Sequence, residues 1–152
     1  GGLFALTKSG LARAYLEKAT KRRRVLDVLM EEQAWSDVVR EAQELVELAL
    51  KAMLREVGVD PPKWHDVGPV LEEQAQLFPE SMRPVLPELA RISKWLRKER
   101  EFSFYGDIDF IPTEQYSEGD ALTATKDAVR VLEAATNLIQ GTDGDPESPD
   151  RR

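Results

Sequence analysis

The hydrophobic and polar positions predict one long amphipathic helix, from Ser36 to a stop at Gly58, as the centre of the fold. Its apolar positions recur at spacings of three and four residues and cover roughly half of the helix circumference. They are Val38, Val39, Ala42, Leu45, Val46, Ala49, Leu50, Met53, Leu54 and Val57. The opposite stripe is polar and contains Arg40, Glu44, Glu47, Lys51 and Arg55. Because one neighbour cannot cover so wide an apolar face, we expect this helix to lie inside a helical bundle.

The same periodicity predicts four further helices, over residues 9–30, 66–78, 82–104 and 117–141. Pro84 and Pro87 fit only near the start of the fourth helix, where missing backbone amides are tolerated. No segment shows sustained alternation of period two, so strands are not expected. The sequence therefore predicts an all-α protein, an antiparallel up-and-down bundle of four to five helices.

The last predicted helix begins at a Ser117 cap, with Asp120 three residues later, and closes at Gly141. Its expected apolar stripe, edged by alanines, consists of Leu122, Thr125, Val129, Leu132, Thr136 and Ile139. Residues 1–141 are thus expected to form a single domain. Residues 142–152 are polar and contain proline, and we expect them to be a disordered tail.

Composition narrows the possible chemistry. The 152-residue chain contains no cysteine and one histidine, which excludes disulfides, thiolate zinc sites and a histidine-rich metal site in one chain. No apolar run approaches the ~20 residues that cross a bilayer. We therefore expect a cytoplasmic protein without a metal, a cofactor or a membrane partner.

The net charge of −7 argues against a general nucleic-acid binder, and no DNA partner is expected. Two segments are nevertheless basic, one up to residue 24 and one over residues 83–100. The consecutive Arg22, Arg23 and Arg24 point to different sides of a helix, so they predict a solvated or partner-facing helix rather than one pocket. The net charge therefore does not exclude a local phosphate-binding site in one of the two basic segments.

The second basic segment supplies the main candidate ligand site. Arg97 and Arg100 share a helix face, and two guanidinium groups there could hold phosphate oxygens. Lys94 extends this positive surface, and Tyr105 could stack on a base. The alternative is a solvated face whose arginines pair with acidic residues or with a partner helix. His65 is a weaker candidate, because a histidine before a helix more often sits in a turn.

Several segments together resemble the HEPN domain family (higher eukaryotes and prokaryotes nucleotide-binding domains). The similarity covers about Ser9 to Ile139 and is carried by Arg40–Gln43, Val46–Leu54, Val57–Asp66, Arg97–Asp107, Ile111-Pro112 and Tyr116. The resemblance implies a bundle of four long helices and a short extra one, often paired as a homodimer. It also implies a partner, since many members are encoded beside a minimal nucleotidyltransferase and some such pairs are toxin–antitoxin systems.

A catalytic branch of the family consists of metal-independent ribonucleases that use an arginine, four to six intervening residues and a histidine. This chain departs from that motif, because nine residues separate Arg55 from His65, and no histidine follows Arg97 or Arg100. Tyr105 falls near the expected imidazole position, but a phenol with a pKa near ~10 is a poor base at neutral pH. The absent motif favours binding over catalysis.

Three hypotheses follow. The first is a nucleotide-binding or partner-binding module that works with a minimal nucleotidyltransferase and contacts its ligand through Arg97, Arg100, Tyr105, Lys94 and His65. The second is a ribonuclease toxin with a variant site at the dimer cleft. The third is a structural dimerisation module without a small ligand. The identity of the nucleotide, the binding or cleavage of RNA, and the partner are not encoded in any motif of the chain.

Overall fold

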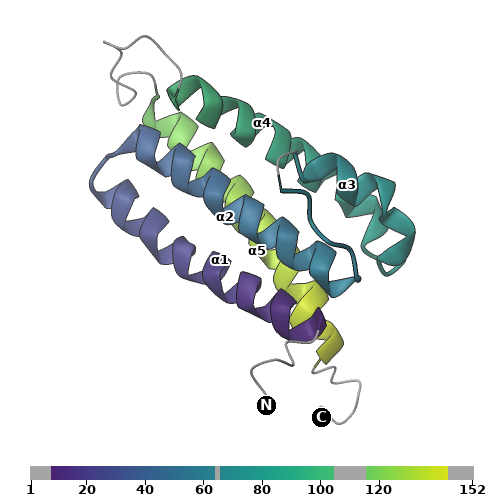
Figure 1. Cartoon of the computed structure of the whole chain (residues 1–152). Coiled ribbons are helices and arrows are strands. Elements are labelled where there is room, and N and C mark those ends of the chain that lie inside the picture. Colours follow the sequence, from purple (N-terminus) through teal and green to yellow (C-terminus); the bar gives the residue numbers. More distant parts are fainter. Residues whose placement is uncertain (1–7, 64–65, 105–115, 144–152) are drawn as a thin grey trace.

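The computed structural model of the protein describes residues 8–63, 66–104 and 116–143. Within these ranges the regular structure is entirely helical, which confirms the all-α prediction. The α-helices are α1 (Lys8–Glu31), α2 (Trp35–Glu56), α3 (Gly68–Glu73), α4 (Leu86–Phe104) and α5 (Glu118–Asp143). The four long helices run alternately up and down, and the short α3 lies beside α4 (Figure 1). Of the predicted tail over residues 142–152, residues 142 and 143 belong to α5, and residues 144–152 lie outside the described residues.

The central position predicted for α2 is confirmed. α2 packs against α1, α5, α4 and α3, and Figure 1 shows it between α1 and α4. Of its ten predicted apolar positions, all but the partly buried Val57 are buried. Covering such a face removes a large apolar area from water, at roughly 25 cal/mol per Å². The burial of this face is the main stabilising contribution to the packing of the bundle.

The C-terminus of α2 also follows the prediction. Gly58 has a φ of 86°, the left-handed conformation that glycine adopts without a steric penalty. The Val59 amide donates to the Leu54 carbonyl at 2.9 Å, and the Gly58 amide donates to the Arg55 carbonyl at 3.0 Å. This pair of bonds is a Schellman motif, and it turns the chain toward α3.

The polar stripe of α2 is less exposed than an amphipathic pattern suggests. The Glu47 side chain is 18 % exposed and the Lys51 side chain 24 %, because α2 is covered on more than one side. Arg55, with 27 % exposure, forms an ion pair with Asp60 at 2.8 Å. Charged groups therefore lie between helices here.

The region between α2 and α4 differs from the single helix predicted over residues 66–78. α3 spans only Gly68–Glu73 and is followed by a separate 3-10 turn, η2 (Ala75–Leu77). Phe78 is extended, with ψ of 155°, because a residue before proline avoids the helical conformation. That geometry directs Phe78 into the core, where it is 2 % exposed.

The fourth predicted helix is also divided. A 3-10 turn, η3 (Arg83–Val85), precedes α4, which begins at Leu86 rather than at residue 82. Pro87 has no amide to donate to the Arg83 carbonyl, so an α-helical ladder cannot run back through this point. Pro87 is the second residue of α4, in the tolerant first turn that the sequence predicted.

The predicted face and end of α5 are partly wrong. Leu122, expected on the apolar stripe, is 52 % exposed, and the alanines expected at its edge lie in the core. The alanines expected at the edge are Ala121, Ala128 and Ala135, and Ala124 and Ala134 are buried with them. Small side chains let α5 pack closely on α2, which a leucine would prevent. The helix also continues past Gly141 to Asp143, because Gly141 does not adopt the left-handed conformation in which a glycine ends a helix.

The predicted start of α5 is correct and forms a reciprocal capping pair. The Ser117 amide donates to Asp120 Oδ2 at 2.9 Å, and the Asp120 amide donates to Ser117 Oγ at 3.1 Å. Two amides of the first turn are thereby satisfied. Among the described helices, none is both long enough and apolar enough to cross a membrane.

Gly68 fixes the distance between α3 and α4. A Cβ at this position would lie 3.1 Å from the Ala90 carbonyl oxygen and 3.2 Å from the Ala90 Cα. Both are backbone atoms of α4, so they cannot move aside independently. The first turn of α3 can rest on α4 at this distance only because residue 68 has no side chain.

We predict that Gly68→Ala destabilises the protein by about 1–3 kcal/mol, because α3 must move away from α4. Gly141→Ala is the matched control, since a Cβ there meets nothing within 4 Å. It should stabilise the protein by up to about 1 kcal/mol through helix propensity. Urea denaturation followed by circular dichroism measures both changes. Equal effects of the two variants would contradict the close approach.

Candidate functional site

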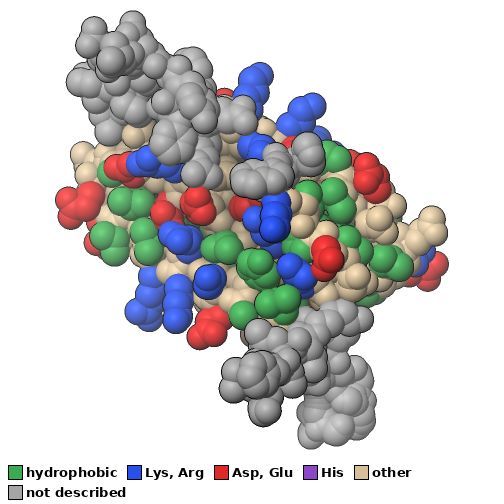
Figure 2. All heavy atoms as spheres, in the orientation of Figure 1, with side chains coloured by type: hydrophobic (Ala, Val, Ile, Leu, Met, Phe, Trp, Pro, Cys, Tyr) green, Lys and Arg blue, Asp and Glu red, His purple; other side chains and the backbone are tan. Residues whose placement is uncertain are grey.

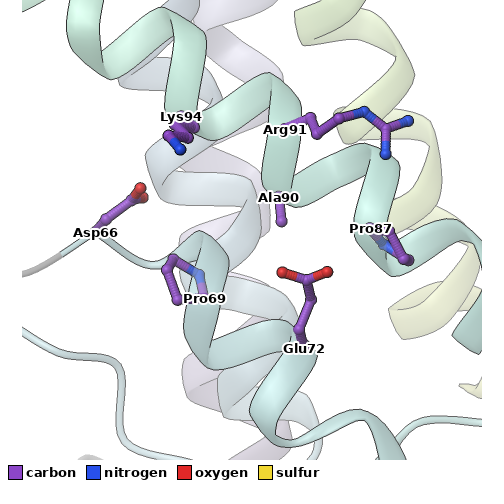
Figure 3. Close-up of a pocket in the computed structure, with 7 residues that line it drawn as sticks. All are labelled: Asp66, Pro69, Glu72, Pro87, Ala90, Arg91 and Lys94. Atoms are coloured by element: carbon purple, nitrogen blue, oxygen red, sulfur yellow. The ribbon is translucent and has the colours of Figure 1, made fainter.

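A hollow of about 270 Å³ lies between α3 and the first half of α4 (Figure 3). Its wall is apolar where the helices meet and charged around the opening. The lining residues are Asp66, Pro69, Glu72, Pro87, Ala90, Arg91 and Lys94. The volume is close to the lower end of the range for small-molecule sites, about 300–1,000 Å³.

Asp66 holds the two walls of this hollow together. Its Oδ1 accepts a hydrogen bond from the Gly68 amide at 3.1 Å and another from Ser93 Oγ at 3.0 Å. The first bond orders the start of α3, and the second joins that start to α4, where Ser93 is buried. With the close approach of Gly68 to Ala90, these bonds set the relative position of the lining residues.

The charged side chains around the opening differ in their direction and in their contacts with the rest of the protein. Arg91 and Lys94 are exposed, and neither forms an ion pair within the described part of the chain. In Figure 3 the Glu72 carboxylate points across the hollow toward Ala90, and the Arg91 guanidinium points outward from α4. The rim of the hollow thus carries both cationic and carboxylate side chains. No group of metal-ligating side chains occurs among the described residues.

The structure separates the predicted site residues. Lys94 lies at the hollow, whereas Arg97, one turn later on α4, is turned toward α2. Arg100 lies in α4, but its side chain is outside the described residues, as are Tyr105 and His65 in full. The binding of one phosphate by Arg97 and Arg100 together therefore stays a prediction.

Arg97 belongs to a polar cluster between α2 and α4. Its guanidinium Nη1 lies 3.8 Å from Glu47 Oε1, and Lys51 Nζ lies 3.6 Å from Glu47 Oε2. The Gln43 side-chain amide donates to Glu47 Oε1 at 3.4 Å. This arrangement matches the alternative in which an arginine pairs with another helix. Glu47 is the centre of the cluster.

Burial raises the pKa of Glu47, because a carboxylate between packed helices loses hydration. Lys51 and Arg97 act in the opposite direction and lower the pKa, without offsetting the burial. Asp66 adds a smaller upward contribution to the pKa through like-charge repulsion. Asp66, which lines the hollow, is thus close enough to the α2–α4 cluster to raise the pKa of Glu47 slightly.

Sequence reasoning missed most of the hollow. Pro69, Glu72, Pro87 and Ala90 carry no chemical signature, and Asp66 is, from the sequence, only the first residue of a predicted helix. One signal was available on α4, where Pro87, Arg91 and Lys94 recur at spacings of four and three and so share a face. The opposing wall could not be found in this way, because it depends on where the six-residue α3 docks.

We predict that Glu47→Gln gains stability relative to the parent as the pH rises from about 4.5 through the raised pKa of Glu47. In that window the folded parent keeps a proton that its unfolded chain has released, so its free energy of unfolding falls with pH. The glutamine variant lacks this titration. Denaturant unfolding of both proteins between pH 4 and 8 measures the difference. A difference that is constant with pH, or of opposite sign, would contradict the assignment.

Comparison with known proteins gives the family. No curated protein and no solved structure matches the chain. The sequence model of the HEPN domain matches residues 12–138, which include α2, α3, α4 and most of α1 and α5. The match covers most of the chain and agrees with the helical bundle described above. The chain therefore belongs to the HEPN domain family.

Proposed function

We propose that this HEPN domain is a binding module that takes a nucleotide in the hollow between α3 and α4. The observation that carries the proposal is the pair of exposed cations, Arg91 and Lys94, at a hollow with a partly apolar wall. In an acidic chain, two cations without ion-pair partners among the described residues are available to a phosphate. A charged nitrogen on phosphate makes a stronger hydrogen bond than a neutral donor.

The remaining lining residues fit the other parts of a nucleotide. Ala90, Pro69 and Pro87 offer an apolar surface to a base or sugar. The Glu72 and Asp66 carboxylates accept hydrogen bonds, so they suit ribose hydroxyls or amino groups and disfavour a second phosphate nearby. A nucleoside phosphate therefore suits the hollow better than inorganic phosphate or pyrophosphate, which have neither an apolar group for the wall nor a ribose or amino group for the carboxylates.

Binding is better supported than catalysis. The only histidine of the chain is His65, outside the described residues, and the spacing to any upstream arginine departs from the ribonuclease motif. Of the two arginines predicted to hold a phosphate, Arg97 is the one whose side chain the structure describes, and it forms an ion pair with Glu47. The ribonuclease alternative thus has no supporting geometry within the described residues.

Two further parts of the proposal rest on family membership. We infer that the module forms a homodimer and works beside a minimal nucleotidyltransferase, as a toxin–antitoxin-like pair in the cytoplasm. Sedimentation of the purified chain tests the first part, and co-purification with the nucleotidyltransferase encoded beside it tests the second. A monomer at micromolar concentration would remove the homodimer from the proposal.

Charge reversal at the hollow tests the nucleotide site. We predict that Lys94→Glu weakens AMP binding by about tenfold or more, because one charge-assisted hydrogen bond contributes about 1.5–3 kcal/mol. Isothermal titration calorimetry at low salt, with inorganic phosphate as the comparison ligand, measures the change. Orthophosphate should bind more weakly than AMP.

Lys98→Glu is the matched control, since Lys98 is exposed on the same helix but does not line the hollow. This variant should bind nucleotide almost as the parent does. Equal losses of nucleotide affinity in both variants would mean that the overall charge of α4, rather than a site at the hollow, determines binding. An absence of nucleotide binding by the parent would remove the proposed site.

A further inference from the structure

The outer face of α1 carries a straight stripe of side chains that the bundle does not use. Ala14, Lys18, Lys21, Val25 and Val28 follow one another at spacings of four, three, four and three residues, and all five are exposed. Alternating steps of three and four residues form the seam along which one helix packs on another. From Ala14 to Val28 the seam is about 21 Å long, at 1.5 Å per residue.

The first property of this seam is its positive charge. Lys18 and the flanking Arg24 are exposed and form no ion pair within the described residues. Lys21 pairs with Glu17 at 3.7 Å, but both side chains are more than two-thirds exposed, so the pair contributes little. Arg22, by contrast, is held by Glu41 at 2.7 Å, and Arg23 lines a hollow beside α5. Figure 2 shows Lys and Arg side chains gathered at the lower left edge of the molecule, over α1.

The second property is apolar. Val25 is 41 % exposed and Val28 is 56 % exposed, and they are two of the four large hydrophobic side chains found exposed among the described residues. They lie one turn apart at the C-terminal end of the seam. β-branched side chains there lose little conformational freedom when a partner covers them.

From these two properties we propose that the α1 seam binds an acidic amphipathic helix of a partner protein. Such a helix would place carboxylates against Lys18 and Lys21 and apolar side chains against Val25 and Val28. Opposite charges across a helix pair set register and orientation. The positive seam on a chain of net charge −7 also directs an acidic partner to this face.

The chemistry of the seam disfavours other occupants. A second copy packing antiparallel on the same seam would bring Lys21 against Lys21, which is repulsive. Single-stranded RNA is bound through aromatic stacking, and the seam has no aromatic side chain. An anionic membrane is wider than one helix and would also meet the exposed Asp27 and Glu31, which lie off the seam on the same helix. The seam is also separate from the nucleotide hollow, since α2 lies between α1 and α4 in Figure 1.

The experiment uses the full chain and a fluorescein-labelled helical peptide of about three heptads. The peptide has two Glu and two Leu at its own seam positions and Ala, Gln and Glu elsewhere. Fluorescence anisotropy at low salt should show saturable binding to the parent. Lys18→Glu/Lys21→Glu should weaken that binding by about tenfold or more, and Val25→Ser/Val28→Ser should weaken it without changing its salt dependence. All substituted side chains are exposed, and circular dichroism verifies that the variants fold.

Two controls separate this seam from general charge. Lys98→Glu/Lys126→Glu, which reverses two exposed cations on α4 and α5, should leave peptide binding unchanged. A peptide with Lys in place of its seam Glu should bind the reversed variant better than it binds the parent. No binding of the acidic peptide to the parent, or equal binding to parent and reversed variant, would overturn the proposal. Tighter binding of a labelled uridine oligonucleotide or of phosphatidylserine vesicles through the same lysines, or a changed oligomeric state in the variant, would also overturn it.

Discussion

The burial of α2 on more than one side is the constraint on which the rest of the structure depends. An apolar face of about half the circumference cannot be satisfied by one neighbour, so α1, α5, α4 and α3 all contact this helix. Polar residues in the second half of α2, among them Glu47 and Lys51, then lie close to other helices rather than in open water. Glu47 is therefore only partly hydrated, and its ion pairs with Lys51 and Arg97 follow from its position.

This constraint also shapes the candidate site. Arg97 of the basic segment lies in the α2–α4 interface, where it pairs with Glu47. Arg91 and Lys94 of the same segment lie instead on the outer side of α4, at the hollow. Asp66 lies between these two environments. It orders α3 through Gly68, joins it to Ser93 of α4, and influences the pKa of Glu47. The hollow is thus built on the same contacts that hold α3 and α4 to the central helix.

The sequence allowed the prediction of features whose causes are local. Periodicity located α2, Gly58 marked its end, and Ser117 with Asp120 marked the start of α5, because each depends on residues within a few positions of one another. Features that depend on packing between helices were missed. Leucine ranks above alanine on any hydrophobic scale, so Leu122 was expected inside, although a close α2–α5 approach requires alanine.

The site shows the same division. The basic character of α4 is legible in the sequence, but the pairing of Arg97 with Glu47 depends on the register of two helices fifty residues apart. No local signal in the sequence marks the break after α3, because Val70, Leu71 and Leu77 continue an apolar helical pattern across it. Pro79 acts only on the residue before it, Phe78, which it holds in an extended conformation. Membership of the HEPN domain family explains the bundle, and the exposed cations on α4 support the proposed ligand.

The most direct test of the account is an NMR titration of the ¹⁵N-labelled chain with AMP, followed through backbone amide shifts. The account predicts saturable shifts concentrated at Gly68, Ala90, Arg91 and Lys94, with the amides of α1 unaffected. Shifts concentrated on α1 or α5, or the absence of saturable shifts at millimolar AMP, would contradict the placement of a nucleotide between α3 and α4.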